Sequence, residues 1–215
     1  APIAQIHIAD IADWLSVSFA HPNATPLTGG AQLLLNGRLV ESLQIPTTVT
    51  EIKPYAFYKY TYLKNVTIPD GVESIGNYAF SGCANLQSLT VPASVKTIGN
   101  YAFEDCAVMA ELTLCEGVEN IGKMAFFGCH ALTSVSIPAS VYTIGDRAFG
   151  YCQSLKGIWV DTNNPNYSSD EDGVLFDKNQ TVLITFPTGF EKFVEQVNGA
   201  TLDGYYTVPS AVKQI

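Results

Sequence analysis

The stretch LTSVSIPASVYTIGDRAFGYCQS, residues 132–154, is one of five consecutive copies of a 23-residue unit. The copies begin at Val40, Leu63, Leu86, Met109 and Leu132. They share the pattern L-x-x-L-x-I-P-x-x-V-x-x-I-G-x-x-A-F-x-x-C-x-x, in which x is any residue. A fixed period of this length is typical of a solenoid, because each unit forms one coil that needs its neighbours to cover its apolar side. The period therefore predicts a stack of coils around one continuous core, and it disfavours an enzyme.

The first half of each coil has the pattern of a short β-strand. In the second copy, the apolar residues Leu63, Val66 and Ile68 are expected to face inward, with Thr67 pointing outward between two of them. Pro69 ends the strand, because proline has no N–H group to donate to a sheet. The equivalent strands of successive coils are expected to stack in parallel, about 4.8 Å apart.

The second half of each coil is predicted to return through a turn and then a short helical turn. Gly76 is expected to adopt a backbone conformation closed to other residues. Asn77 is a candidate cap for the helical turn that carries Ala79, Phe80 and Cys83. Stacking the copies in register places identical residues in columns through the core, and the largest column is Phe57, Phe80, Phe103, Phe126 and Phe149.

This pattern resembles the BspA-like, or Treponema-type, leucine-rich repeat. The resemblance is close over Val40–Val160, and the stretch IPASVYTIGDRAFGYC (residues 137–152) matches the family's repeat motif at nearly every fixed position. Departures occur at Lys53-Pro54, at Tyr60 and at Cys115. The resemblance implies an α/β repeat, namely a right-handed leucine-rich-repeat solenoid with stacked parallel short strands and short helical turns. It also implies secreted or surface-attached proteins of host-associated bacteria and some protists, without transferable catalytic residues.

Four of the five cysteines recur at the same position of successive coils, namely Cys83, Cys106, Cys129 and Cys152. They fit either a disulfide or metal framework or a column of small buried side chains, and the second interpretation is favoured. Zinc ligands usually occur in pairs two to four residues apart. In addition, the first copy has Tyr60 at this position, which can form neither a disulfide nor a thiolate cluster.

The composition excludes several classes of partner. The 215-residue chain is 47% hydrophobic and only 14% charged, which indicates a globular protein. Its formal net charge of −9 disfavours nucleic acid, because phosphate binding needs clustered lysine and arginine. The longest apolar runs are far too short for a membrane-spanning segment.

Residues 1–39 do not follow the repeat and are predicted to form a helix-plus-hairpin cap over one end of the solenoid. Gln5–Ile8 alternates like a strand, and Asp10–Phe19 has its apolar residues at helical spacing. Trp14 in this helix is expected to be a buried plug. Asn36-Gly37 predicts the tight turn of the hairpin.

The remaining boundaries follow from the same register. Residues 40–160 are expected to hold five and a half 23-residue repeats. Residues 161–215 are expected to hold a variant coil with a second hairpin, followed by a repeat that is truncated at Ile215. The three segments are predicted to form one continuous domain.

No catalytic or cofactor-binding pattern is present in the sequence. His7, His21 and His130 are far apart, and no serine or cysteine lies in a recognisable nucleophile motif. The acidic loop of residues 161–173 lacks the glycine and the glutamate that an EF-hand calcium loop requires at its sixth and twelfth positions. We therefore expect no catalytic residue, no metal site and no cofactor.

The outward positions of the strands are the best candidates for binding. They are mostly small and polar, and Trp159 is the one large aromatic residue among them. The threonine and serine column can equally be a plain soluble sheet face. A second column, formed by Tyr55, Tyr78 and Tyr101, offers either stacking support or another contact surface. The candidate binding residues are Lys64, Asn65, Thr67, Gln87, Ser88, Thr90, Glu111, Thr113, Thr133, Ser134, Ser136, Lys156 and Trp159.

These observations favour a non-enzymatic, secreted or cell-surface module that binds a protein ligand. The resemblance further implies a bacterial adhesion module, with a host extracellular-matrix protein as the candidate ligand. Two alternatives stay open. The first is a structural spacer within a larger surface protein. The second is a carbohydrate-binding accessory module in which Trp159 stacks on a sugar. The ligand and the oligomeric state do not follow from the sequence.

Overall fold

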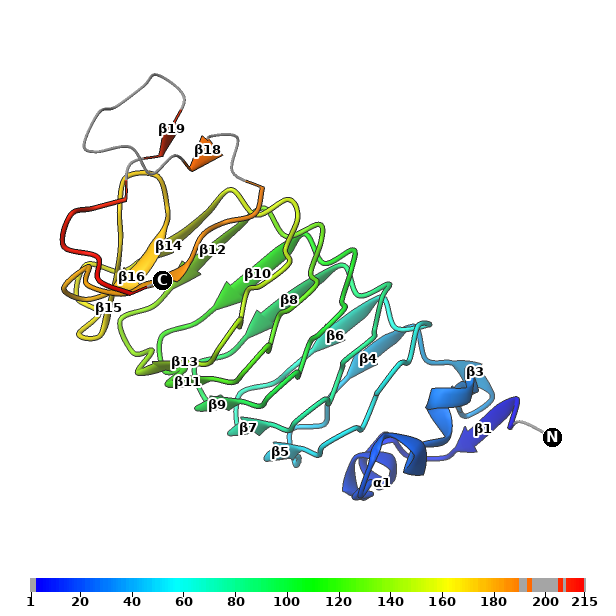
Figure 1. Cartoon of the computed structure of the whole chain (residues 1–215). Coiled ribbons are helices and arrows are strands. Elements are labelled where there is room, and N and C mark those ends of the chain that lie inside the picture. The colour runs from blue at the N-terminus through cyan, green and yellow to red at the C-terminus, as the bar shows by residue number, and fades with distance from the viewer. Residues whose placement is uncertain (1–2, 190–192, 195–204, 207, 215) are drawn as a thin grey trace.

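The computed structural model describes residues 3–189, 193–194, 205–206 and 208–214. The described chain is a parallel-strand solenoid of about seven turns with little helix (Figure 1). Two rows of short strands run along the body, and successive coils lie side by side from the N-terminal to the C-terminal end (Figure 1). The repeat period therefore translates directly into the spatial order of the coils.

The chain begins with elements outside the repeat. β1 (Gln5–Ile8) pairs in parallel with β2 (Gln32–Leu35), which turns at Asn36-Gly37 into antiparallel β3 (Arg38–Leu39). Between β1 and β2 lie α1 (Ile11–Ser16), η1 (Pro22–Ala24) and η2 (Pro26–Gly29). The side chain of Asp10 caps α1 by accepting a hydrogen bond from the N–H of Ala12.

Trp14 lies buried in α1, which confirms the expectation that it fills the interior. Its side chain is 6% exposed, and its Nε1–H donates to the carbonyl oxygen of Ala56 in the first repeat at 3.0 Å. This hydrogen bond satisfies the one polar group of the indole. The N-terminal helix is thereby tied to the first coil through both packing and a hydrogen bond.

The predicted parallel strands form the first strand row. Residues 23 positions apart face each other across the row, for example Leu43 and Val66, Leu89 and Leu112, and Val135 and Ile158. The strands of this row are β4 (Ser42–Gln44), β6 (Asn65–Thr67), β8 (Ser88–Val91), β10 (Glu111–Leu114), β12 (Ser134–Ile137) and β14 (Gly157–Val160).

A second strand row runs along another edge of the solenoid (Figure 1). It is a five-stranded parallel sheet in which each strand has two residues, and the second residue is an isoleucine in every coil. The sequence predicted inward anchors here but no strands. Its members are β5 (Glu51–Ile52), β7 (Ser74–Ile75), β9 (Thr97–Ile98), β11 (Asn120–Ile121) and β13 (Thr143–Ile144).

The predicted core columns are present. The phenylalanine column is at most 1% exposed, and neighbouring rings are nearly parallel with centroids 5.2 to 5.5 Å apart. The four cysteines at the repeated position are buried and free, which confirms a column of small side chains. Each of their thiols donates to the backbone carbonyl of the phenylalanine one coil earlier, at 3.2 to 3.4 Å.

The predicted short helical turns are wrong. Within the described residues, helices occur only before the first repeat. In the turns that follow the second strand row, every second backbone N–H donates to the carbonyl three residues earlier. The N–H groups between them donate to carbonyls of the next coil. The ones that cross between coils are the N–H groups of Tyr78, Phe80 and Gly82, which donate to Asn100, Ala102 and Glu104 at 2.7 to 3.0 Å.

Backbone geometry explains why no helix forms there. One residue at the start of each turn is left-handed, and it is not a glycine. A left-handed residue interrupts the right-handed conformation that a helix requires. The residues in this left-handed column are Tyr55, Tyr78, Tyr101, Met124 and Arg147, with φ between 50° and 61°.

Two further expectations for this turn are corrected. Gly76 does not have a positive φ; instead, a Cβ atom there would lie 2.5 Å from the backbone nitrogen of Pro54. Glycine is required because the neighbouring coil approaches closely. Asn77 does not cap its own turn, because its Oδ1 accepts a hydrogen bond from the N–H of Asn100 at 2.8 Å. Asn100 repeats this contact with Lys123, so the asparagines link successive coils.

Beyond the repeats, a three-stranded antiparallel sheet packs beside β14. It consists of β15 (Tyr167–Ser169), β16 (Leu175–Asp177) and β17 (Leu183–Thr185), so the second hairpin is formed by β16 and β17. β18 (Phe193–Val194) pairs with β19 (Tyr205–Tyr206).

Candidate binding face

All thirteen candidate binding residues are exposed. Nine of them lie in strands of the first row, and the other four, Lys64, Gln87, Thr133 and Lys156, directly precede a strand. We call this surface, defined by those thirteen residues, the strand face. Most of it forms because strand residues alternate between the core and solvent, so the first and third residues of β6, β8, β10 and β12 point outward. In β8, for example, Ser88 and Thr90 are exposed whereas Leu89 and Val91 are buried.

The in-register pairing arranges the strand face in columns. Thr90 lies directly opposite Thr113, and Ser136 lies opposite Trp159. A hydrogen bond and an ion pair link residues of the strand face to the first coil. Asn65 Nδ2 donates to Ser42 Oγ at 3.3 Å, and Lys64 forms an exposed ion pair with Glu41 at 2.7 Å. The result is a polar surface in which one column, Thr67, Thr90, Thr113 and Ser136, carries hydroxyl groups on strands about 4.8 Å apart.

Trp159 interrupts this polar surface at its C-terminal end. Trp159 is 44% exposed, as its outward position in the strand predicts. A Cβ atom on Gly157 would lie 2.9 Å from Cζ2 of the indole. The indole therefore lies against the bare backbone of Gly157, at a position where the preceding strand carries Ser134. Glycine at this one place makes room for the ring.

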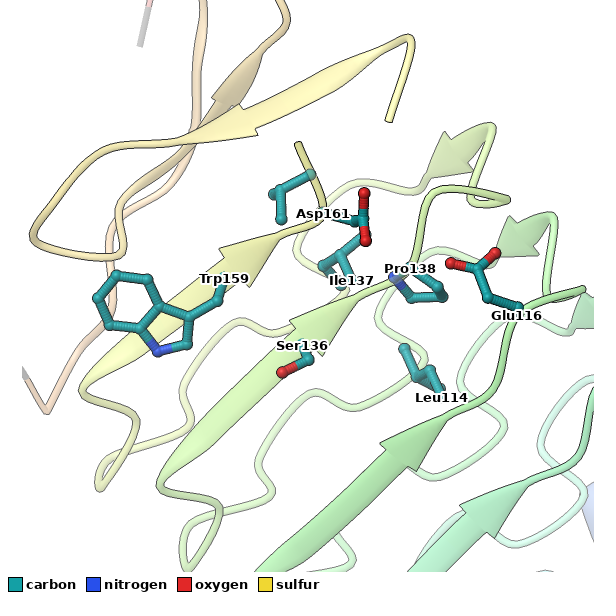
Figure 2. Close-up of a pocket in the computed structure, with 8 residues that line it drawn as sticks. Leu114, Glu116, Ser136, Ile137, Pro138, Trp159 and Asp161 are labelled. Atoms are coloured by element: carbon teal, nitrogen blue, oxygen red, sulfur yellow. The ribbon is translucent and has the colours of Figure 1, made fainter. Parts of the chain in front are cut away.

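A shallow depression of about 390 Å³ lies beside Trp159 across β10, β12 and β14 (Figure 2). Trp159 lies at one end of it and Glu116 at the other, with Ser136 and Asp161 between them (Figure 2). Its apolar lining residues are Leu114, Ile137, Pro138 and Val160. The depression thus combines an aromatic end with an acidic end.

The two carboxylates of the depression are held in place by the loops that follow the strands. Glu116 accepts hydrogen bonds from the N–H groups of Ala139 and Ser140, at 2.8 and 3.2 Å. Asp161 accepts from the N–H and the side-chain amide of Asn163, at 2.8 and 3.1 Å. These bonds come from neutral donors, and the ion pairs in the described part of the chain involve neither carboxylate.

Sequence reasoning missed Glu116 and Asp161 because both lie after the strands, outside the outward positions. A signal was present in the register. Asp161 stands where the preceding coil has Pro138. Glu116 belongs to the coil before that one, and its position in the repeat is one residue after that of Pro138. Positions that are adjacent in the repeat lie side by side in a stack of coils.

The tyrosine column forms a second aromatic surface. Tyr78 stacks on Tyr55 and on Tyr101, with ring centroids 5.2 and 4.6 Å apart, and Tyr58 packs edge-on against two of these rings. All four are half-buried. Burial raises the pKa of Tyr78, as does its proximity to Tyr101. The contacts within the column show that these rings support one another across successive coils.

The described residues contain no cluster of three or more side chains suited to hold a metal ion. Burial raises the pKa of Cys152 to about 11 and raises the pKa values of the other three column thiols as well. These thiols therefore stay protonated and unreactive near neutral pH. No helix in the described part of the chain is long and apolar enough to cross a membrane.

Comparisons with known proteins agree with this architecture. The family model of the BspA-type leucine-rich-repeat region matches residues 34–156 with six copies. No curated protein is significantly similar to the chain. Among solved structures, the pneumococcal vaccine antigen PcpA is 29% identical with a TM-score of 0.69, and the match covers 83% of this chain and 42% of PcpA.

Two other bacterial structures are similar. A leucine-rich cell surface protein of Faecalibacterium prausnitzii is 27% identical with a TM-score of 0.58, over 95% of this chain and 54% of that protein. The leucine-rich-repeat protein of T. pallidum is 30% identical with a TM-score of 0.54, over 55% of this chain and 57% of that protein. The chain therefore spans about half the length of these proteins.

Proposed function

Because the chain belongs to the BspA-type leucine-rich-repeat family, we propose that it is a non-enzymatic module that binds a protein ligand through the strand face. The observation that supports this proposal is the exposure of all thirteen variable residues in or directly before the strands of the first row. The repeat gives this surface a rigid support, because the strands pair in parallel two by two and their inward residues belong to the same core as the phenylalanine column.

We further propose a secreted or cell-surface location and a host or extracellular-matrix protein as the ligand. One structural neighbour is described as a cell surface protein and another as a vaccine antigen, both from bacteria. These two descriptions support a surface location for this chain as well. The net charge of −9 is compatible with protein partners that carry basic segments.

The terminal segments are proposed to close the solenoid. Residues 1–39 would cap the first coil, since α1 and Trp14 cover apolar residues that the first repeat otherwise exposes. Residues 161–215 would close the other end, where the hydroxyl of Tyr167 accepts a hydrogen bond from the N–H of Ile144, in the last strand of the second row. With residues 40–160 between them, the segments would form one continuous domain.

A binding assay with extracellular-matrix proteins tests the proposal. The full chain would be passed over immobilised collagen, laminin and fibronectin, with serum albumin as the control surface. We expect saturable binding to at least one matrix protein at micromolar concentrations and none to albumin. Absence of binding to all three matrix proteins would favour the alternative, a spacer whose polar surface keeps a larger protein soluble.

A further inference from the structure

We propose that the depression beside Trp159 is an anchor site for a basic segment of the protein ligand. In this arrangement lysine or arginine side chains of the ligand reach Glu116 and Asp161, while an adjacent apolar residue of the ligand packs against Trp159. The inference rests on the proposed function and adds the chemistry of the partner to it.

Charge complementarity is the first argument. The lining residues include two carboxylates and no lysine, arginine or histidine. Both carboxylates are positioned by neutral hydrogen-bond donors, so their negative charges are oriented but not neutralised by these contacts. A guanidinium or ammonium group brought into the depression meets an acceptor of the opposite charge at Glu116 or at Asp161.

The second argument is the way in which Trp159 is held. A tryptophan free to fold back on the surface would be a poor anchor, because binding would have to order it. Here the bare backbone of Gly157 allows the indole to lie flat against β14, and 44% of the side chain remains accessible. Tryptophan fixed before binding is the residue type that most often dominates the binding energy of a protein interface.

The third argument is the relative placement of the two ends. Trp159 and Glu116 lie at opposite ends of the depression and come from different coils (Figure 2). A ligand that touches both must cross β12 between them, as a peptide segment can. The apolar residues between the ends suit the aliphatic part of a lysine or arginine side chain.

The chain provides an internal control for a binding experiment. It contains two tryptophans. Trp14 is buried and bonded to Ala56, whereas Trp159 is exposed beside the depression. A nitrogen-15 spectrum therefore shows two indole N–H signals, of which only that of Trp159 should respond to a ligand in the depression.

The probe is the nonapeptide (Gly-Arg-Leu)3, compared with (Gly-Glu-Leu)3 and with the tetrasaccharides cellotetraose and chitotetraose. We expect the arginine peptide to shift the Trp159 signal in a saturable, salt-sensitive manner, without moving the Trp14 signal. The glutamate peptide and the sugars should leave both signals in place. A shift of the Trp159 signal by a tetrasaccharide would overturn the inference in favour of a sugar site.

Variants then assign the contacts, with peptide affinity read by fluorescence anisotropy. Trp159→Ala should weaken binding of the arginine peptide by at least about tenfold. Glu116→Gln and Asp161→Asn should each weaken it roughly two- to fivefold. Gly157→Ser should also weaken it, because a Cβ there displaces the indole without removing it.

Matched controls lie elsewhere on the surface. Tyr142→Ala removes another exposed aromatic, and Glu73→Gln removes another exposed carboxylate; neither should alter the affinity. If the controls weaken binding as much as the variants in the depression, the inference is wrong. If a matrix protein binds but the arginine peptide leaves Trp159 unmoved, the anchor site is refuted while the proposed function stands. If the peptide binds at Trp159 but no matrix protein does, the anchor stands and the proposed ligand class fails.

Discussion

Replacing single glycines by alanine separates two physical reasons for glycine in this fold, which are close approach and backbone conformation. At Gly29 neither applies, because φ is ordinary and a Cβ atom meets nothing within 4 Å. At Gly37 only the conformation applies, with φ of +77° in open space. At Gly99 only the approach applies, since a Cβ atom would lie 2.7 Å from the backbone of the preceding coil. At Gly117 both apply, with φ of +120° and a carbonyl oxygen 2.2 Å away.

The expected free energies of unfolding follow from these geometries. Gly29→Ala should stabilise the protein by about 0.4–1 kcal/mol, because alanine restricts the unfolded chain. Gly37→Ala should cost about 1–2 kcal/mol for the left-handed conformation. Gly99→Ala should cost about 1–3 kcal/mol, since its N–H donates to Ile75 at 2.8 Å and the coil cannot retreat without losing that bond. Gly117→Ala should cost more than either, about 2–5 kcal/mol.

Urea unfolding followed by circular dichroism measures the four variants. Hydrogen exchange is measured on the same variants, because a stack of coils can unfold in parts and the urea transition need not be two-state. Exchange should accelerate first in the coil that carries the substitution and its neighbours. If Gly99→Ala proves as stable as Gly29→Ala, close packing between coils is not the reason for the repeated glycine.

Further predictions address the core, the thiols, the left-handed column and one carboxylate. Phe103→Ala should cost about 3–5 kcal/mol in urea unfolding, because the ring is fully buried between neighbours at 5.2 and 5.4 Å; a cost below about 1 kcal/mol would contradict the stacked core. With Ellman's reagent near pH 8, Cys115 alone should react in the native protein and all five cysteines after unfolding, since burial raises the pKa of the other four; rapid reaction of two or more would show that the column is open. Arg147→Gly should be about 1–2 kcal/mol less destabilising than Asp146→Gly in the same unfolding assay, because Arg147 has φ of 52°; equal costs would mean that the left-handed column stores no strain. Burial raises the pKa of Asp177, but hydrogen bonds from the following turn outweigh it and lower the pKa below 3.8. The ionised Asp177 carboxylate therefore stabilises the folded hairpin fully above the pKa of the unfolded state, and this stabilisation is lost as the pH falls through the lower folded pKa. Hydrogen exchange in the hairpin should accelerate over that pH range. Asp177→Asn should abolish this pH dependence.

The repeat period predicted most of the fold because it acts on every coil in the same way. The position of each strand in the first row and the phenylalanine and cysteine columns follow from stacking identical residues. The second strand row was missed, since a two-residue strand such as Ser74–Ile75 is too short to show an alternating pattern. The prediction of a helical turn was wrong, because Tyr78 is left-handed and a tyrosine in the sequence gives no sign of that backbone conformation.

The candidate site divides in the same manner. Comparison of the variable positions among the repeats predicted which side chains are exposed, and all thirteen are. The depression depends on single substitutions in the repeat instead. Gly157 makes room for the indole, and Asp161 replaces a proline. Such departures become meaningful only when the neighbouring coils are placed beside them.

The central claim, that the strand face binds a protein ligand, is tested most directly by one pair of substitutions in a single coil. Thr90 is exposed on the first strand row and Thr97 is exposed on the second, so threonine to arginine makes the same chemical change on two faces. Affinity for whichever matrix protein binds the wild-type chain is measured for both variants. Thr90→Arg should weaken binding at least about tenfold through steric clash at the interface, whereas Thr97→Arg should leave it unchanged. Equal affinities for the two variants, or a loss confined to Thr97→Arg, would contradict the account.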